Sequence, residues 1–302
     1  MMKQKYSVQG SLILTLLLFG IHEVLAAPIT FNTALPVARD EKLVRVQTKL
    51  IRSTDDPSGL ERDLTVWAFP LVAVYGVTEK LALFAILPVF DKKMKVNTAS
   101  GRLKRGDSGI GDLTTMARYT LWKKDAPGKT TRLAPFAALK MPTGQDEATD
   151  SAGSLPQPLQ LGTGSWDYSL GLVLTRQTLA RQIDASFSYT FKTEANAFEF
   201  GDTSRLDISY QHRLWPRELG SGVPGFVYGV LESNLIWQNN NTFQGIEDDN
   251  TGGVTWFLAP GIQYVTRRTV LECAVQIPVV QDLNGRALGN DFIGTLSFRM
   301  NF

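Results

Sequence analysis

Several segments of this chain alternate strictly between apolar and polar side chains over about ten residues. The clearest covers residues 183–191, where Ile183, Phe187 and Phe191 share one parity and Asp184 and Ser188 share the other. A period of two places these sets on opposite faces of a β-strand. Residues 292–302, which end on Phe302, repeat the pattern. Each such strand needs either a second sheet or lipid against its apolar face.

Alternating segments of this kind follow one another along most of the chain. They cover residues 43–52, 63–75, 80–90, 112–122, 131–141, 165–175, 182–192, 204–215, 225–237, 254–265, 270–281 and 291–302. Strands of about ten residues bounded by turn residues are typical of membrane-spanning barrels. The sequence therefore predicts an all-β fold, an antiparallel transmembrane β-barrel of about 12 strands, with ten or fourteen strands as the neighbouring alternatives.

Large aromatic side chains stand near the ends of these segments. They are Trp67, Tyr75, Trp122, Trp166, Trp215, Trp237, Trp256 and Tyr264. Aromatic girdles at the two membrane interfaces have this placement. The alternative is a soluble sandwich, which would need a second sheet to cover every apolar face.

The N-terminus has the features of a secretory signal peptide. Lys3 and Lys5 precede an apolar run at residues 12–19, and small residues follow at Ala26 and Ala27. The run is too short for a membrane-spanning helix, which needs about 20 residues. We expect cleavage after Ala26. The organisation that follows is a signal peptide at 1–26, an N-terminal periplasmic or plug segment at 27–42, and an outer-membrane β-barrel at 43–302 of a Gram-negative bacterium.

Charged loops are expected at the outer end of the barrel, where the longer connections fall. Residues 142–164 and 239–253 are acidic, and residues 91–111 are basic. The plain interpretation is solvated surface charge. The alternative is a charged rim that contacts lipopolysaccharide or a solute, so outer-membrane lipids and lipopolysaccharide are expected partners.

Composition excludes several other classes of protein. The net charge of +2 gives no argument for nucleic acid, and a mean hydropathy of -0.07 is too polar for a helical membrane protein. The single cysteine, Cys273, shares the apolar parity of its segment and is read as lipid-facing. His212 is the only histidine after cleavage and lacks a partner serine two positions away, which disfavours a lipid hydrolase. We therefore predict no catalytic residues, no metal ligands and no cofactor.

Parity places many charged side chains toward the lumen, because charges are costly on the lipid face. The candidate lumen-lining residues are Arg45, Lys49, Arg118, Asp167, Asp184, Arg205, Asp207, Arg213, Glu232, Glu272 and Arg299. Residues 66–75 and 81–90 are instead apolar on both faces. That apolar part of the lumen is expected to contact either the N-terminal segment, which we favour, or an apolar solute.

Three motifs carry a family resemblance. Residues 109–119 read GIGDLTTMARY, residues 134–145 read APFAALKMPTGQ and residues 161–172 read LGTGSWDYSLGL. From about residue 60 to the end, the chain resembles the bacterial outer-membrane family labelled "putative MetA-pathway of phenol degradation", from which it departs at Met116. The glycine pairs Gly109/Gly111 and Gly162/Gly164 are incomplete as dinucleotide loops and are interpreted as strand-end turns.

The resemblance implies an outer-membrane channel or transporter for small compounds of aromatic or hydrophobic character. A structural or adhesive barrel without transport is the alternative, and a lipid hydrolase is a distant third. Similarity to bacterial barrel proteins in general also implies that the barrel assembly machinery recognises the last strand, which ends at Phe302. The solute, the open or plugged state of the pore and the oligomeric state are left open by the sequence.

Overall fold

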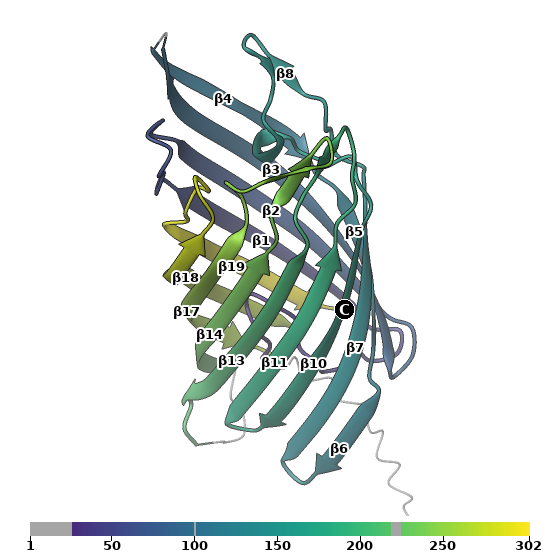
Figure 1. Ribbon diagram of the computed structural model, residues 1–302. Coiled ribbons are helices and arrows are strands. Elements are labelled where there is room, and N and C mark those ends of the chain that lie inside the picture. Colours follow the sequence, from purple (N-terminus) through teal and green to yellow (C-terminus); the bar gives the residue numbers. More distant parts are fainter. Residues whose placement is uncertain (1–25, 100, 219–224) are drawn as a thin grey trace, which may run out of the picture.

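The computed structural model describes residues 26–99, 101–218 and 225–302, so the predicted signal peptide, except for Ala26, lies outside the described residues. Each of twelve long strands pairs antiparallel with two neighbours, and the β1–β19 and β7–β10 pairings close the sheet into a barrel (Figure 1). These strands are β1 (Lys42–Ser53), β2 (Asp63–Gly76), β3 (Leu81–Thr98), β5 (Leu113–Tyr119), β7 (Lys129–Met141), β10 (Asp167–Thr178), β11 (Arg181–Phe191), β13 (Thr203–Trp215), β14 (Phe226–Gln238), β17 (Gly253–Val265), β18 (Thr269–Leu283) and β19 (Phe292–Asn301). The predicted antiparallel barrel of twelve strands is confirmed.

The strands begin and end within three residues of the predicted bounds except at the end of β3, and two regions contain strand pairings that were not predicted. β3 continues past Phe90 to Thr98 and pairs there with β4 (Gly101–Ile110), forming a hairpin that rises above the rest of the wall (Figure 1). The predicted strand at 112–122 ends at Tyr119, and β6 (Trp122–Ala126) then folds back on β7. Both extensions lie past the part of the wall in which apolar, lipid-facing residues alternate with polar ones. A hairpin in water needs no apolar face, so hydrophobic periodicity does not predict these extensions.

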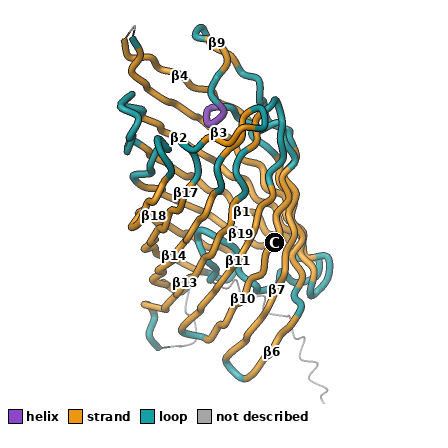
Figure 2. Tube along the Cα trace, in the orientation of Figure 1, coloured by secondary structure: helices purple, strands orange, loops and turns teal. Residues whose placement is uncertain are grey.

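The wall of the barrel is apolar outside and polar inside. Exposed apolar side chains on the outside include Phe187, Leu206 and Ile262, while Gln211, Glu232 and Gln263 on the inside are fully buried. The eight aromatic side chains singled out near the strand ends are all exposed. Loops gather at the two ends of the barrel, between which the wall is formed by strands (Figure 2). This inversion of the usual soluble pattern is what a lipid environment requires.

Short elements build the outer end. They are β8 (Thr149–Asp150), β9 (Gly153–Ser154), the 3-10 turn η1 (Gln157–Leu159), β12 (Phe198–Glu199), β15 (Asn241–Phe243) and β16 (Ile246–Asp248). Leu155 and Leu159 pack with Ala148 against Leu64 and Met94, which fixes the loop at 142–164 to β2 and β3. Within the described parts of the chain, no helix is long and apolar enough to cross a membrane.

Residues 26–40 are called the inner segment; most of it lies inside the barrel, and its last residues, Arg39 and Asp40, are exposed at the rim. Ala26 packs against Val265 and Val270 near the periplasmic end, and Ile29 packs against Val230 and Ala274. Further along the segment, Ala34 reaches Ala134 and Val173 in β7 and β10. The segment thus crosses the lumen from the β14–β18 wall to the wall formed by β7 and β10.

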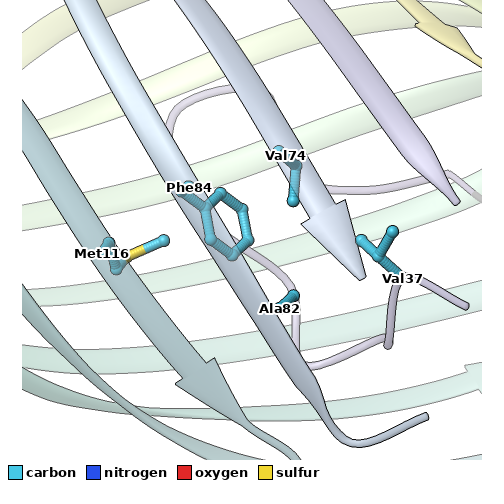
Figure 3. Close-up of a cluster of buried hydrophobic side chains, with 5 residues drawn as sticks. All are labelled: Val37, Val74, Ala82, Phe84 and Met116. Atoms are coloured by element: carbon cyan, nitrogen blue, oxygen red, sulfur yellow. The ribbon is translucent and has the colours of Figure 1, made fainter. Parts of the chain in front are cut away.

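The end of the inner segment covers the apolar part of the lumen. Val37 packs with Val74, Ala82, Phe84 and Met116 (Figure 3). These wall residues come from β2, β3 and β5, which include the two strands that are apolar on both faces. Their inward apolar side chains therefore contact protein here, and Met116, the departure from the family pattern, is one of those contacts.

Candidate functional site: the barrel lumen

Glu232 anchors the first part of the inner segment. Its side chain is fully buried on β14. The carboxylate accepts hydrogen bonds from the Ile29 backbone N–H (2.7 Å), the Thr30 backbone N–H (3.0 Å) and the Thr30 hydroxyl (2.5 Å), and Ser209 donates a fourth at 3.2 Å. A buried carboxylate is stable only when its oxygens are satisfied in this way. Glu232 therefore ties residues 29–30 to the wall.

Arg118 and Thr175 hold the second part of the segment. The Arg118 guanidinium donates to the carbonyl oxygens of Thr33 and Leu35, the latter at 2.6 Å, and its Cζ lies 5.0 Å from the centroid of the Phe84 ring. The Thr175 hydroxyl accepts from the Ala34 backbone N–H at 2.7 Å and donates to Asp184. Two predicted lumen residues, Arg118 and Asp184, thus act on the inner segment, the second through Thr175.

Arg45 and Glu272 form a third anchor. The guanidinium of Arg45 pairs with the Glu272 carboxylate and donates to the Ile29 carbonyl oxygen at 2.7 Å. Glu272 also accepts from Gln263 (2.9 Å) and Ser297 (2.8 Å). Gln263 in turn donates to the Ala27 carbonyl oxygen. These hydrogen bonds join particular atoms of the segment to particular wall residues. They therefore hold the segment in the lumen and also set its position along the wall.

Three of the predicted lumen residues form ion pairs farther toward the outer end. Asp167 pairs with Lys140 and Lys192, each at 2.7 Å. Arg205 pairs with Asp207 at 2.9 Å, and Asn234 donates to the same aspartate at 2.7 Å. The Asp167 cluster joins β7, β10 and the residue after β11, so it bridges three neighbouring strands at the outer mouth.

The remaining predicted residues are placed separately. Lys49 is half-buried on β1, and no hydrogen bond or ion pair involves it within the described chain. Arg299 is buried and lines the periplasmic end of the lumen. Arg213 lies at the periplasmic rim, where it donates to the Leu179 carbonyl oxygen at 3.1 Å. Arg213 is therefore away from the ion pairs of the central lumen.

Acidic and basic side chains of the lumen differ in exposure. In the ion pairs formed by Arg45, Lys140, Lys192 and Arg205, the carboxylates are between 0% and 6% exposed and the cations between 14% and 31%. The carboxylates thus lie against the wall, and the cations cover them. Water or a solute in the lumen therefore meets mostly positive charge, although the residue content is nearly balanced.

A cavity of about 450 Å³ lies between the inner segment and the wall of β1, β2, β3, β5 and β19. Its apolar lining includes Phe31, Val37, Val72 and Phe84. Its charged lining consists of Arg45, Arg118, Arg299 and Glu41. This is the size and composition of a small-molecule site, an apolar surface with a few placed polar groups.

The three family-like motifs meet at the outer mouth around Asp112. Its buried carboxylate accepts hydrogen bonds from the backbone N–H groups of Thr143 (3.1 Å), Gly144 (3.0 Å) and Thr163 (3.0 Å), and from the Thr163 hydroxyl (3.0 Å). A Cβ at Gly144 would lie 2.9 Å from the backbones of Gly111 and Gly162. Glycine is required where three backbones approach this closely. The motifs therefore build one junction, in agreement with their interpretation as strand-end turns.

Asp112→Ala is expected to lower the free energy of unfolding by roughly 2–4 kcal/mol, because it leaves buried backbone donors without an acceptor. Chemical denaturation of the refolded barrel in detergent measures this. The exposed Glu147 of the following loop provides the matched control, Glu147→Ala, which should change stability little. Equal stability of the two variants would contradict the structural importance of the junction.

The lumen also contains polar residues that were not among the candidates predicted from the alternation of charged residues. Lys140 forms ion pairs with both Asp112 (3.4 Å) and Asp167. It was not predicted because other residues on the same face of its strand, Ala134 and Phe136, are apolar. Neutral side chains such as Gln182, Gln211 and Gln263 are fully buried in the interior. These amides could have been predicted from the sequence, because they occupy every second position of their strands together with other polar residues.

The histidine and the cysteine considered in the sequence analysis both lie on strands with an outward parity. His212 follows the outward parity of Tyr210 and Leu214, and its ring stacks on Tyr210 with centroids 6.3 Å apart. No cluster of three potential metal ligands occurs within the residues that the structure describes. Cys273 is exposed on the outer face of β18.

The closed barrel, its apolar outer belt and its aromatic ends define the class of the protein, an outer-membrane β-barrel. The family model described as "Putative MetA-pathway of phenol degradation" matches residues 57–277. The chain belongs to this family. No curated protein matches the sequence.

A solved structure supports the fold. The COG4313 outer membrane channel from Pseudomonas putida F1 is 15% identical, with a TM-score of 0.67 over 94% of this chain and 98% of that chain. Two other barrels are less similar. They are the translocator domain of the autotransporter NalP from Neisseria meningitidis (11% identity, TM-score 0.46, 89% of this chain and 91% of that chain covered) and the NanC porin (10% identity, TM-score 0.47, 85% and 98% covered).

Proposed function

We propose that the chain is an outer-membrane channel for small compounds that combine an aromatic or apolar body with a negative charge, and that the inner segment restricts its lumen. The observation that carries this proposal is the cavity of about 450 Å³, which sets Phe31 and Phe84 beside Arg45, Arg118 and Arg299. The aromatic side chains suit a ring, and the guanidinium groups suit a carboxylate or phenolate. The family description, which refers to phenol degradation, agrees with such a solute.

The charge exposure of the lumen supports the same solute class. Cations cover the carboxylates in the ion pairs, so the field along the path favours anions. An anionic solute would pass the outer Lys140–Asp167–Lys192 cluster first and reach the arginines beside the inner segment later.

Conductance of the refolded protein in a planar bilayer tests the proposal. With a salt gradient, the reversal potential should indicate anion preference, and small aromatic acids should block the current at lower concentrations than the corresponding alcohols. If the protein is silent both with and without residues 27–40 of the inner segment, the barrel is closed and structural. If neutral alcohols block as well as acids, the proposed role of the arginines is wrong.

Lys49→Glu is expected to move the reversal potential toward cation preference, because Lys49 faces the lumen with no ion pair in the described chain. The exposed Lys124 in β6, at the periplasmic end, gives the matched control Lys124→Glu, with the same charge change outside the lumen. An equal shift for both variants would show that overall charge, and not the lumen, sets the selectivity.

A further inference from the structure

The two faces of the β3–β4 hairpin differ in what they contact. Trp67 points outward from the barrel, and its antiparallel partner Asp91 shares that face. Moving two residues at a time along β3 keeps the same face, so Lys93 and Lys95 also point outward. Lys104 is the β4 partner of Lys95, Arg102 is the partner of Asn97 further along the same face of β3, and Arg52 is the β1 partner of Thr65, which pairs with Lys93. The outer cationic face therefore consists of Arg52, Lys93, Lys95, Arg102 and Lys104.

The basic side chains on the inward face of the hairpin contact the loop at 142–164. Lys92 donates to the carbonyl oxygens of Pro158 (3.2 Å) and Gln160 (2.5 Å). Arg105 makes two hydrogen bonds of 2.8 Å to Asp150, and these hydrogen bonds hold the pKa of Asp150 below its ordinary value. The basic residues on this side therefore have structural partners within the protein.

The outer cationic face is only partly neutralised. Asp63 pairs with Arg52 and lies 3.7 Å from Lys95, Asp91 pairs with Lys93 at 2.6 Å, and Glu61 pairs with Arg102 at 3.2 Å. Three carboxylates thus face five cations. Lys104 has no ion pair within the described residues, and the side chains of Lys93 and Lys95 are 52% exposed. A net positive charge remains available to an external group.

The position of this face indicates what that group is. The cations stand directly above Trp67, and below it the outward side chains Phe69 and Leu71 on β2 and Leu83 on β3 continue the exposed apolar belt. Successive outward positions are about 7 Å apart along a strand. A ligand that is phosphorylated at one end and carries acyl chains at the other would contact both surfaces at once.

We propose that the outer cationic face binds the phosphate groups of lipopolysaccharide, the phosphorylated glycolipid of the outer leaflet, while its acyl chains lie on the apolar belt of β2 and β3. Lysine and arginine are the side chains that bind phosphate in proteins. A free phosphate would use only the charges and would leave the adjacent apolar belt without a role. This interaction does not depend on the proposed channel function.

Binding of purified lipid A to the refolded full-length protein in detergent tests the proposal, with native mass spectrometry as the readout. The test variant changes Lys93, Lys95, Arg102 and Lys104 together to Gln. These side chains are exposed, so the barrel should fold, and a heat-modifiability assay checks this. We expect the variant to bind bisphosphorylated lipid A at least about tenfold more weakly than the wild type.

The control removes four charges from the periplasmic end, where Lys80, Lys123, Lys124 and Lys129 are all exposed. Their joint change to Gln should leave lipid A binding at the wild-type level. Dephosphorylated lipid A should bind wild-type protein and test variant equally. Equal binding of bisphosphorylated lipid A by wild type and test variant would overturn the proposal, as would competition by millimolar inorganic phosphate, which would indicate a free-anion site.

Discussion

Deletion of residues 27–40 is expected to convert the barrel into a steadily conducting pore with a several-fold larger conductance. The inner segment crosses the lumen and contacts walls that lie nearly opposite one another, at Ile29 and at Ala34. A twelve-stranded barrel is wide enough to leave an aqueous path once this segment is gone. Glu232 and Arg118 would then face water instead of the segment, so their charges would be hydrated and the wall should still fold.

The measurement compares single-channel conductance of refolded chains that begin at residue 27 and at residue 41. A synthetic peptide of residues 27–40, added from the periplasmic side, provides the control and should restore part of the blockage. An unchanged conductance after deletion would show that the outer loops, and not the inner segment, limit the path.

Glu232→Ala is expected to release the first part of the inner segment, with a loss of about 3 kcal/mol in the free energy that holds it in the lumen. The substitution removes the acceptor of three hydrogen bonds from Ile29 and Thr30. Hydrogen bonds to a charged group are among the stronger ones, and the freed backbone donors must find water. Open events in the bilayer should become more frequent.

Labelling from solution measures the release directly. In a Cys273→Ser background, a cysteine at Phe31, which directly follows the residues held by Glu232, should react with a maleimide much faster when Glu232 is changed to Ala. Glu232→Gln, which keeps an acceptor oxygen, should give an intermediate rate, and Glu247→Ala in an exposed outer strand should have no effect. Identical labelling rates for all four proteins would show that Glu232 is not the anchor.

The barrel was predictable because lipid imposes a simple local rule on every strand. In β11, Ile183 and Phe187 point outward while Asp184 lies fully buried inside, as alternation requires. The β3–β4 hairpin was not predicted by this rule. Lys92 and Lys93 are neighbours in sequence and lie on opposite faces of β3, and both faces meet water there, so both residues can be charged. Hydrophobic alternation arises where one face of a strand meets lipid and the other meets water. A strand with water on both faces has no such alternation, so its extent is not predicted.

The anchors of the inner segment could not be predicted in detail. Glu232 was assigned to the lumen from its parity, but its partner Ile29 is 203 positions away in sequence. Nothing local in residues 26–40 specifies which wall residues they meet. Asp112 gives a similar case, since its motif was recognised but the convergence of Thr143 and Thr163 on its carboxylate depends on three loops meeting in space.

The inner segment starts and finishes at the same end of the barrel. Ala26 packs beside the β17–β18 turn, and the Asp40 backbone N–H donates to the Gly76 carbonyl oxygen at the β2–β3 turn. A chain that enters and leaves through one opening is not threaded, so it can be withdrawn as a loop without breaking the β1–β19 seam. The seam and the segment are therefore mechanically independent, and the barrel can change between occupied and empty states with every strand pair intact.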